Sequence, residues 1–198
     1  LLDRPINNRA DFDQWLRDFS DLDETVDEFA SWKYINNTCH TDDAEIEKAY
    51  MHYVENIEPK IKPVYFELQK KLIAAAKMTG ADKDPVIAYL AKRWQADVDV
   101  YREENIPLQV KDTKLATEYG KICGAMMIDY KGKPHTLQQM SRYLEETERD
   151  TREEAWRLIV DRRMQDREKI DGIFDELVAL RDTIGRNAGH PDYRSFIW

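Results

Sequence analysis

Long stretches of this chain place apolar residues at three- and four-residue steps, and few residues interrupt them. Only 7 of its 198 residues are glycine and 7 are proline, so turns must be few and the elements between them long. Apolar spacing of this kind is typical of an amphipathic α-helix. The sequence therefore predicts an all-α fold, an elongated assembly of several long amphipathic helices, and not a sandwich or barrel of short strands.

Three of these helices fall in the first half of the chain. They are predicted over residues 11–35, over residues 42–80 and from Asp84 onward. A break of the first helix near Ser20 remains an open alternative. The second helix must be split or kinked by Pro59 and Pro63, because proline lacks the amide hydrogen that a helix needs.

The second half contains the one β-hairpin that the sequence predicts, near residues 125–136. Met126, Ile128 and Tyr130 alternate with less apolar neighbours, as in a strand with one buried face, and a turn around Lys131 follows. Further helices are predicted over residues 111–123, from Thr136 to about Glu146, and from Asp150 through Ile184.

We expect the chain to be a single helical N-terminal domain or fragment, residues 1–198. Residues 1–104 would form a helical subdomain, and residues 105–198 a segment with the hairpin and a long helix. The chain does not begin with Met, and it ends in the aromatic-rich YRSFIW, so we expect a longer parent protein. The aromatic end also favours self-association; the alternative is that Phe196 and Trp198 fold back onto the chain's own core.

Composition excludes several classes of partner. The formal net charge of -9 would repel nucleic acid and an anionic membrane surface. No apolar run approaches the length of a membrane span, and the first residues lack a signal-peptide layout. Cys39 and Cys123 are too far apart in sequence for a zinc knuckle. A cytoplasmic location fits these features.

The side-chain chemistry predicts no catalytic residue and no metal site. No His-Glu-x-x-His or Glu-x-x-His motif occurs. His52 and Glu55 are one helical turn apart, but no third ligand is in view, which favours an ordinary surface pair. Residues 161–169 contain seven charges in nine; a solvated helix face is the common explanation, and a polar cleft the alternative.

A set of short motifs in the second half nevertheless stands out. Its members are Asp129, Gly132, Thr136, Leu137, Asp150, Arg152, Ala155, Arg186, Asn187, Gly189 and Tyr193. Together with the sequence around them, they resemble the N-terminal half of oligoendopeptidase F-like enzymes, in the thimet-oligopeptidase family of zinc metallopeptidases. The resemblance is good over the last half of the chain, and it extends to the earlier helices only in their pattern.

The resemblance implies a non-catalytic role for this chain. In that family the zinc motif lies in a C-terminal catalytic domain, which this chain lacks, so the chain alone should hold no cofactor and be inactive. The parent would be a zinc metalloendopeptidase that cleaves short peptides, with this domain as one wall of its cleft and the catalytic domain as its partner. The alternative function is a free-standing helical adaptor that binds a partner helix in an apolar groove.

The matched residues are expected to be structural. Gly132 suits a turn, and Gly189 suits a helix end with a positive φ angle. Arg152 is expected to reach a neighbouring carboxylate.

Overall fold

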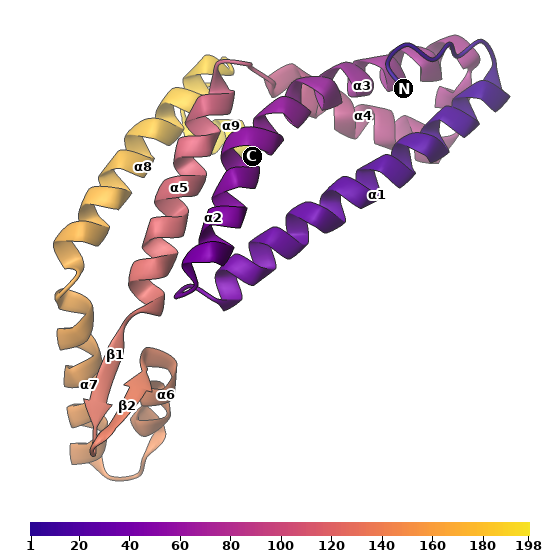
Figure 1. Ribbon diagram of the computed structural model, residues 1–198. Coiled ribbons are helices and arrows are strands. Elements are labelled where there is room, and N and C mark those ends of the chain that lie inside the picture. The colour runs from indigo at the N-terminus through magenta and orange to yellow at the C-terminus, as the bar shows by residue number, and fades with distance from the viewer. The chain divides into compact units, whose positions relative to one another are not determined.

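The computed structural model describes all residues, 1–198, and confirms the predicted all-α fold with one small hairpin (Figure 1). The elements in chain order are α1 (Arg9–Cys39), α2 (Ala44–His52), the π-helix η1 (Tyr53–Ile57), α3 (Glu58–Thr79), the 3₁₀-helix η2 (Ala81–Lys83), α4 (Pro85–Val100), α5 (Asn105–Gly124), β1 (Met127–Tyr130), β2 (Lys133–Thr136), α6 (Leu137–Ser141), the 3₁₀-helix η3 (Arg142–Glu145), α7 (Arg149–Met164), α8 (Arg167–Asn187) and α9 (Tyr193–Ile197). None of these helices has both the length and the apolar character needed to cross a membrane.

Two compact units make up the chain. The first contains Leu1–Thr113 and Leu180–Trp198, and the second contains Lys114–Ala179. The first unit thus takes in residues 105–113 and 180–198, which the sequence analysis placed in its second segment.

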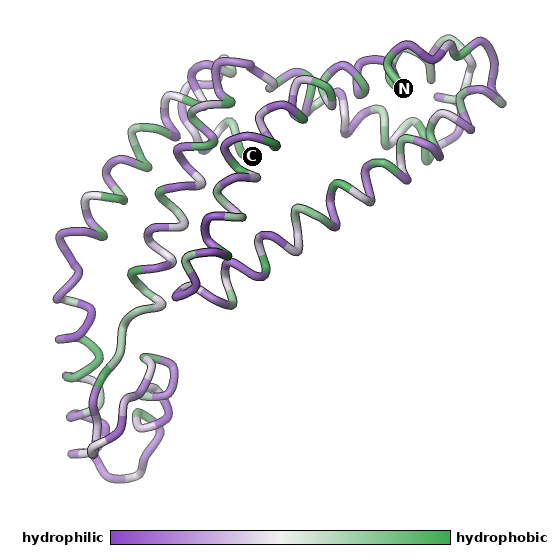
Figure 2. Tube along the Cα trace, viewed as in Figure 1, coloured by the Kyte–Doolittle hydropathy of each residue, from purple (hydrophilic) through white to green (hydrophobic).

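The core of the first unit is an aromatic cluster at the start of α1. Phe12 and Trp15 are fully buried and Phe19 is 2% exposed, and all three pack with residues of α3 such as Leu68 and Leu72. The rings of Trp15 and Phe19 stack at 5.6 Å. Burying each such side chain contributes about 2 kcal/mol. Helix α1 itself continues past Ser20 without a break, with hydrophobic residues recurring along it (Figure 2).

A smaller cluster holds the other end of α1. Tyr50, Tyr53 and Val54 are buried there, with Ala30 of α1 packed against them. The ring of Phe29 meets that of Tyr53 edge to face at 5.8 Å. Helix α1 is therefore anchored at two places along its length.

The predicted second helix is interrupted by a π-turn just before Pro59, whereas Pro63 lies inside α3 and does not end it. In η1 the amide of Glu58 donates to the carbonyl of Tyr53, five residues back. Pro59 follows at once in the first turn of α3, where its missing amide is tolerated, and Pro63 lies inside the same helix. A π-turn adds a residue to one helical turn, so the chain continues from α2 to α3 with the prolines accommodated.

Buried polar side chains connect the start of α5 with the end of α8. Asn105 is 2% exposed; its Nδ2 donates to the Ile184 carbonyl at 3.0 Å, and its Oδ1 accepts from Asn187 Nδ2 at 2.8 Å. Arg102 Nε donates to the Asn187 carbonyl at 3.1 Å. These bonds hold the last turn of α8 against the start of α5, and they explain why residues 180–198 belong to the first unit.

The second unit is built around the hairpin. Met126, Ile128 and Tyr130 are buried, as their alternation predicted, and pack with Met140 and Ile159. Strands β1 and β2 pair antiparallel, with Met127 opposite Thr136 and Tyr130 opposite Lys133. The predicted capping box at Thr136 is present: Gln139 N donates to Thr136 Oγ1 at 3.1 Å, and Thr136 N donates to Gln139 Oε1 at 2.8 Å.

The predicted helix from Asp150 through Ile184 is wrong in two respects. Its N-cap is Glu148, with Asp150 in the first turn, and it is divided into α7 and α8 at residues 165–166. The break contains neither glycine nor proline; instead Asp166 N bonds the Arg163 carbonyl three residues back, and Arg162 Nη1 pairs with the Asp166 carboxylate at 2.7 Å. The rest of stretch 161–169 is exposed, which agrees with a solvated face.

Replacing Asn105 should test the connection between α5 and α8. Asn105→Ala removes the donor to the Ile184 carbonyl and the acceptor of Asn187 Nδ2. We therefore expect the free energy of unfolding to fall by about 2 kcal/mol. Urea denaturation followed by circular dichroism measures it. Asn36→Ala, at an exposed position of α1, is the control and should change stability by less than about 0.5 kcal/mol. Equal stability of both variants would refute the structural role of Asn105.

The hairpin turn gives a second prediction. Lys131 and Gly132 have φ angles of 53° and 77°, a left-handed pair typical of a type I′ turn. Gly132→Val should lower the free energy of unfolding by at least about 1 kcal/mol, because a β-branched residue is strained there. Lys131→Gly is the matched control. It removes the strain of a positive φ angle at residue 131 and also removes the contact of Lys131 with the Tyr130 ring. It should therefore not show the loss of stability expected for Gly132→Val. A Gly132→Val protein that melts with the parent would rule out this turn geometry.

Candidate functional site

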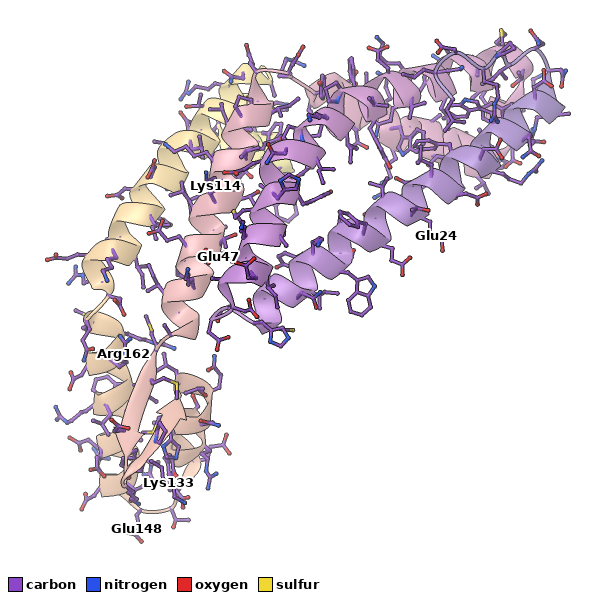
Figure 3. All side chains as sticks on the ribbon, in the orientation of Figure 1. Glu24, Glu47, Lys114, Lys133, Glu148 and Arg162 are labelled. Carbon is purple, nitrogen blue, oxygen red and sulfur yellow. The ribbon has the colours of Figure 1, made fainter.

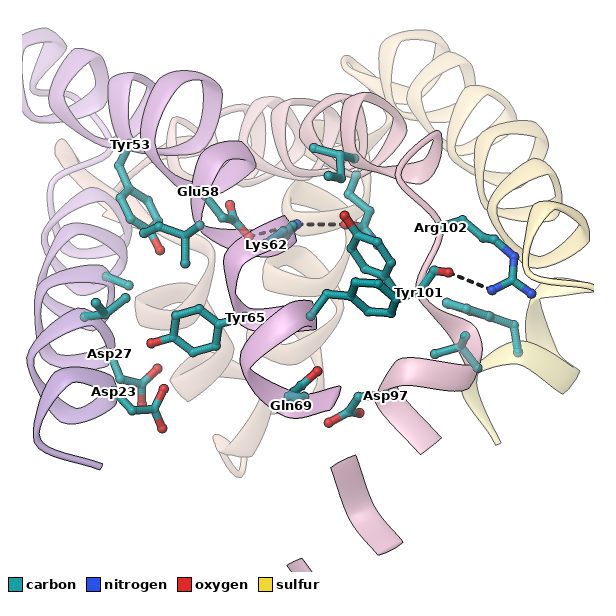
Figure 4. Close-up of a pocket in the computed structure, with 18 residues that line it drawn as sticks. Asp23, Asp27, Tyr53, Glu58, Lys62, Tyr65, Gln69, Asp97, Tyr101 and Arg102 are labelled. Carbon is teal, nitrogen blue, oxygen red and sulfur yellow. Dashed lines mark hydrogen bonds and ion pairs between the residues drawn. The ribbon is translucent and has the colours of Figure 1, made fainter. Parts of the chain in front are cut away.

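A cavity of about 450 Å³ lies in the first unit, between α1, α3, the end of α4, the start of α5 and α9 (Figure 4). Its lining is Asp23, Val26, Asp27, Ala30, Tyr53, Glu58, Ile61, Lys62, Tyr65, Phe66, Gln69, Asp97, Val100, Tyr101, Arg102, Ile106, Gln109 and Phe196. Its volume falls within the usual range for small-molecule sites, about 300–1,000 Å³.

Helix α3 supplies the face that runs through the cavity. Glu58, Lys62, Tyr65 and Gln69 follow one another at three- and four-residue steps, so they lie on one side of the helix. Lys62 Nζ pairs with Glu58 Oε1 at 3.0 Å and donates to Gln109 Oε1 of α5 at 2.8 Å. The charge of Lys62 is thereby compensated within the site.

The junction of α4 and α5 forms another side of the cavity. The rings of Phe66 and Tyr101 stack at 4.2 Å with an angle of 18° between their planes. Arg102, the next residue, gives its guanidinium to carbonyl groups: those of Asn187 and Ala188, at 3.1 and 3.3 Å, and those of Asp99 and Tyr101. Arg102 therefore supports the wall and offers no free charge.

Tyr65 stands out among the lining residues. Its hydroxyl oxygen is buried, and Figure 4 shows it pointing toward Asp23 and Asp27 of α1. Burial, and next its hydrogen-bonding interaction with the Asp23 carboxylate, raise the pKa of Tyr65 well above its ordinary value. Burial also raises the pKa of Tyr53 and of Tyr101, so all three phenols are neutral at physiological pH.

The cavity lining lacks the serine, cysteine and histidine side chains of the commonest nucleophile–base pairs. The lining includes no threonine either, and its one lysine, Lys62, is ion-paired with Glu58. Nowhere do three or more histidine, cysteine or carboxylate side chains form a group that could hold a metal ion. His52 Nδ1 lies 3.4 Å from Asn56 Nδ2, within the exposed part of α2 and η1.

The residues singled out by the sequence lie outside this cavity, in two other places. Asp129, Gly132, Thr136, Leu137, Asp150, Arg152 and Ala155 belong to the second unit, whereas Arg186, Asn187, Gly189 and Tyr193 belong to the first. The prediction for Arg152 is wrong: its Nη1 donates to the carbonyls of Glu146 and Thr147, at 2.7 and 2.8 Å, and not to a carboxylate. Gly189 has a φ angle of 88°, as expected at a helix end.

The two aromatic residues at the end of the chain, Phe196 and Trp198, differ in whether they fold back onto the chain. Phe196 lines the cavity and its ring lies 5.8 Å from that of Tyr193, whereas Trp198 is 98% exposed. Self-association through this end stays a prediction.

The sequence analysis missed the cavity residues. It treated Tyr65 as one more apolar position of a helix, and it gave Asp23 no role. The signal in the sequence was the pair Asp23 and Asp27, two like charges one helical turn apart, an arrangement that destabilises a helix.

Alkaline pH should reveal the environment of Tyr65. Because its pKa is raised in the folded state, the folded chain keeps this proton where the unfolded chain loses it, and the free energy of unfolding should fall as pH rises above about 10. Tyr65→Phe should make this fall shallower, because the variant lacks the group whose pKa differs between the folded and unfolded chain.

Urea titrations between pH 8 and pH 11.5 measure the free energy of unfolding of the parent and of the variant. Tyr89→Phe, at a residue that is 71% exposed, should keep the parent's pH dependence. If the Tyr65 and Tyr89 variants behave alike, the Tyr65 hydroxyl is not buried as described.

The fold of this chain matches the folds of several solved structures. PZ peptidase A, solved with an inhibitor, superposes with a TM-score of 0.85 at 22% identity, covering 94% of this chain and 33% of that one. A protein assigned as an oligoendopeptidase F gives a TM-score of 0.87 at 23% identity, covering 97% and 34%. Another so assigned, from Bacillus anthracis, gives 0.83 at 21% identity, covering 93% and 34%. The chain spans about a third of the length of the structures it matches.

Comparison with curated proteins finds no match. Among protein families, residues 3–100 match the Peptidase M3 N-terminal domain. This match falls on the first half of the chain, whereas the motifs that carried the resemblance lie in the second half. The chain therefore belongs to the peptidase M3 family, through the N-terminal domain that its residues 3–100 match.

Proposed function

We propose that this chain is the non-catalytic N-terminal domain of a zinc metallopeptidase that cleaves oligopeptides, and that it forms one wall of the substrate cleft. The observation that carries the proposal is the match of residues 3–100 to the Peptidase M3 N-terminal domain. The fold agreement with peptidases about three times as long supports it.

The side chains of this chain do not fit a zinc ion. A catalytic zinc site needs three protein ligands around one position, and no such group is present. The zinc of the proposed peptidase would therefore be held by a His-Glu-x-x-His motif in a catalytic domain outside these 198 residues. No chemical step is assigned to this chain.

The proposed contribution of the chain is shape. Long helices with well-packed cores, such as α1 on α3 and α4, present extended rigid surfaces, and a cleft bounded by rigid walls admits short peptides while excluding folded proteins. A cytoplasmic location is part of the proposal, supported by two free cysteines, Cys39 and Cys123, which suit a reducing compartment.

The activity of the chain alone tests the division of labour. Purified residues 1–198 should retain no stoichiometric zinc after dialysis and should not cleave a quenched fluorescent oligopeptide. The longer gene product that contains this chain should do both, and a chelator should abolish its cleavage. Metal content is measured by elemental analysis and cleavage by fluorescence.

Two results would overturn the proposal. Chelator-sensitive cleavage by residues 1–198 alone would show that the chain is itself catalytic. An open reading frame that stops at Trp198 would leave no catalytic partner in the same protein and would favour the adaptor.

A further inference from the structure

An exposed stripe without charge runs along the second half of α1. Its members recur at steps of three and four residues, so they lie on one side of the helix, and all are exposed: Leu22, Thr25, Phe29, Trp32, Asn36 and Cys39. The stripe is about 26 Å long. Ten of the twenty residues from 9 to 28 are charged, so charge is absent from this side of the helix and not from the helix as a whole.

The spacing of the stripe is that of a coiled coil. Steps of three and four alternate from residue 22 to residue 39, which places Leu22, Phe29 and Asn36 at heptad position a and Thr25, Trp32 and Cys39 at position d. Positions a and d form the seam along which another helix packs. The stripe also has an exposed tryptophan near its middle, and aromatic side chains with few charges are typical of the centre of a protein interface. The spacing therefore favours a helix as its occupant.

The charges beside the stripe favour a second copy of the same helix. In a parallel pair, a residue at position g meets the residue at position e of the partner five positions later. Glu28 is at g and Lys33 is at e, so two copies in register would form this ion pair twice. In an antiparallel pair g faces g, which would set Glu28 against Asp21, Glu28 or Ile35 of the other copy.

Two further features agree with a parallel pair. Lys33 Nζ lies 5.4 Å from the centre of the Phe29 ring, so its charge is held at the edge of the stripe. A single asparagine at position a, here Asn36, fixes the register of parallel two-stranded coiled coils.

We propose that the chain forms a parallel dimer in which the α1 stripe packs against the same stripe of a second copy. Such an interface is symmetric, with one surface serving both partners. Helix α1 is already held by its own core, so association does not have to pay for forming the helix. The stripe is short, and the dimer should therefore dissociate on dilution.

Sedimentation velocity of residues 1–198 over a range of concentrations tests the interface. We expect a reversible monomer–dimer equilibrium, which Trp32→Glu should weaken at least about tenfold, because it places a charge in the centre of the seam. Trp198→Glu is the control. This tryptophan is 98% exposed but lies outside the stripe, and its replacement should leave the dissociation constant within about twofold.

Exchanging the flanking charges tests the parallel register. Glu28→Lys should weaken the dimer about fivefold, because it sets two lysines against each other twice, and adding Lys33→Glu in the same chain should restore the parent affinity within about twofold. Glu24→Lys is the matched control, since Glu24 is on the same helix but at heptad position c, with its side chain pointing into solvent (Figure 3). Circular dichroism confirms that each variant is folded.

Cys39 provides a second test of the register. Residues at position d face their own copies across a parallel seam, at a separation that a disulfide can span. Diamide, which is reduced to its hydrazine as two thiols are oxidised to a disulfide, should therefore link two chains through Cys39. Cys39→Ser should abolish the linked dimer on a non-reducing gel, and Cys123→Ser should retain it.

Three results would overturn the inference. A chain that stays monomeric at all concentrations would point instead to another part of a longer protein as the occupant of the stripe. Loss of association in the Trp198 variant but not in the Trp32 variant would place the contact at the aromatic end of the chain. Failure of the double exchange to restore what Glu28→Lys weakens would refute the parallel register. None of these outcomes depends on the proposed peptidase function, because no peptide is cleaved in these experiments.

Discussion

The burial of Phe12, Trp15 and Phe19 against α3 and α4 is the interaction on which the first unit depends. These three rings are almost fully buried, and they fix the first half of a helix that runs from Arg9 to Cys39. The apolar face of an amphipathic helix can be buried only against other elements. Most of the stability of α1 must therefore come from such contacts.

The second anchor of α1, near Phe29 and Ala30, determines what lies between the two. Tyr53 meets Phe29 there, and the π-turn that begins at Tyr53 brings the chain into α3. Asp23 and Asp27 fall between the anchors, where α1 is joined to neither cluster and the cavity opens. The cavity is thus a consequence of holding one long helix at two places.

Local patterns predicted local features well. Alternation at Met126, Ile128 and Tyr130 gave the buried face of the hairpin, and Thr136 with Gln139 gave a true capping box. Both signals involve residues within a few positions of each other, so no knowledge of the tertiary fold was needed.

Features that depend on distant residues could not be predicted in the same way. The hydrogen bonds of Asn105 join residues about 80 positions apart in sequence. No pattern in the sequence near Asn105 indicates them. The break between α7 and α8 contains no glycine or proline. The residues around it favour a helix, so the local sequence gives no sign of the turn at Asp166. Tyr65 looked like one more apolar helix position because its ring packs against the core, whereas the residue also lines the cavity.

Family membership was reached by two routes that use different parts of the chain. Motifs from Asp129 to Tyr193 carried the resemblance, and the family match covers residues 3–100. Motifs at turns and helix ends are short and can be recognised from a few residues. In long helices the similarity to a family is spread over many positions, with few specific residues at any one place.

Photo-cross-linking tests the central claim, that this chain lines a peptide-binding cleft, most directly. The proposed longer gene product, with the glutamate of the proposed His-Glu-x-x-His motif replaced by glutamine so that the peptide survives, would be irradiated with an oligopeptide carrying a benzophenone. Our account predicts labelled positions within residues 1–198, lost when excess unlabelled oligopeptide competes. Competed labelling confined to residues outside these 198 would contradict it.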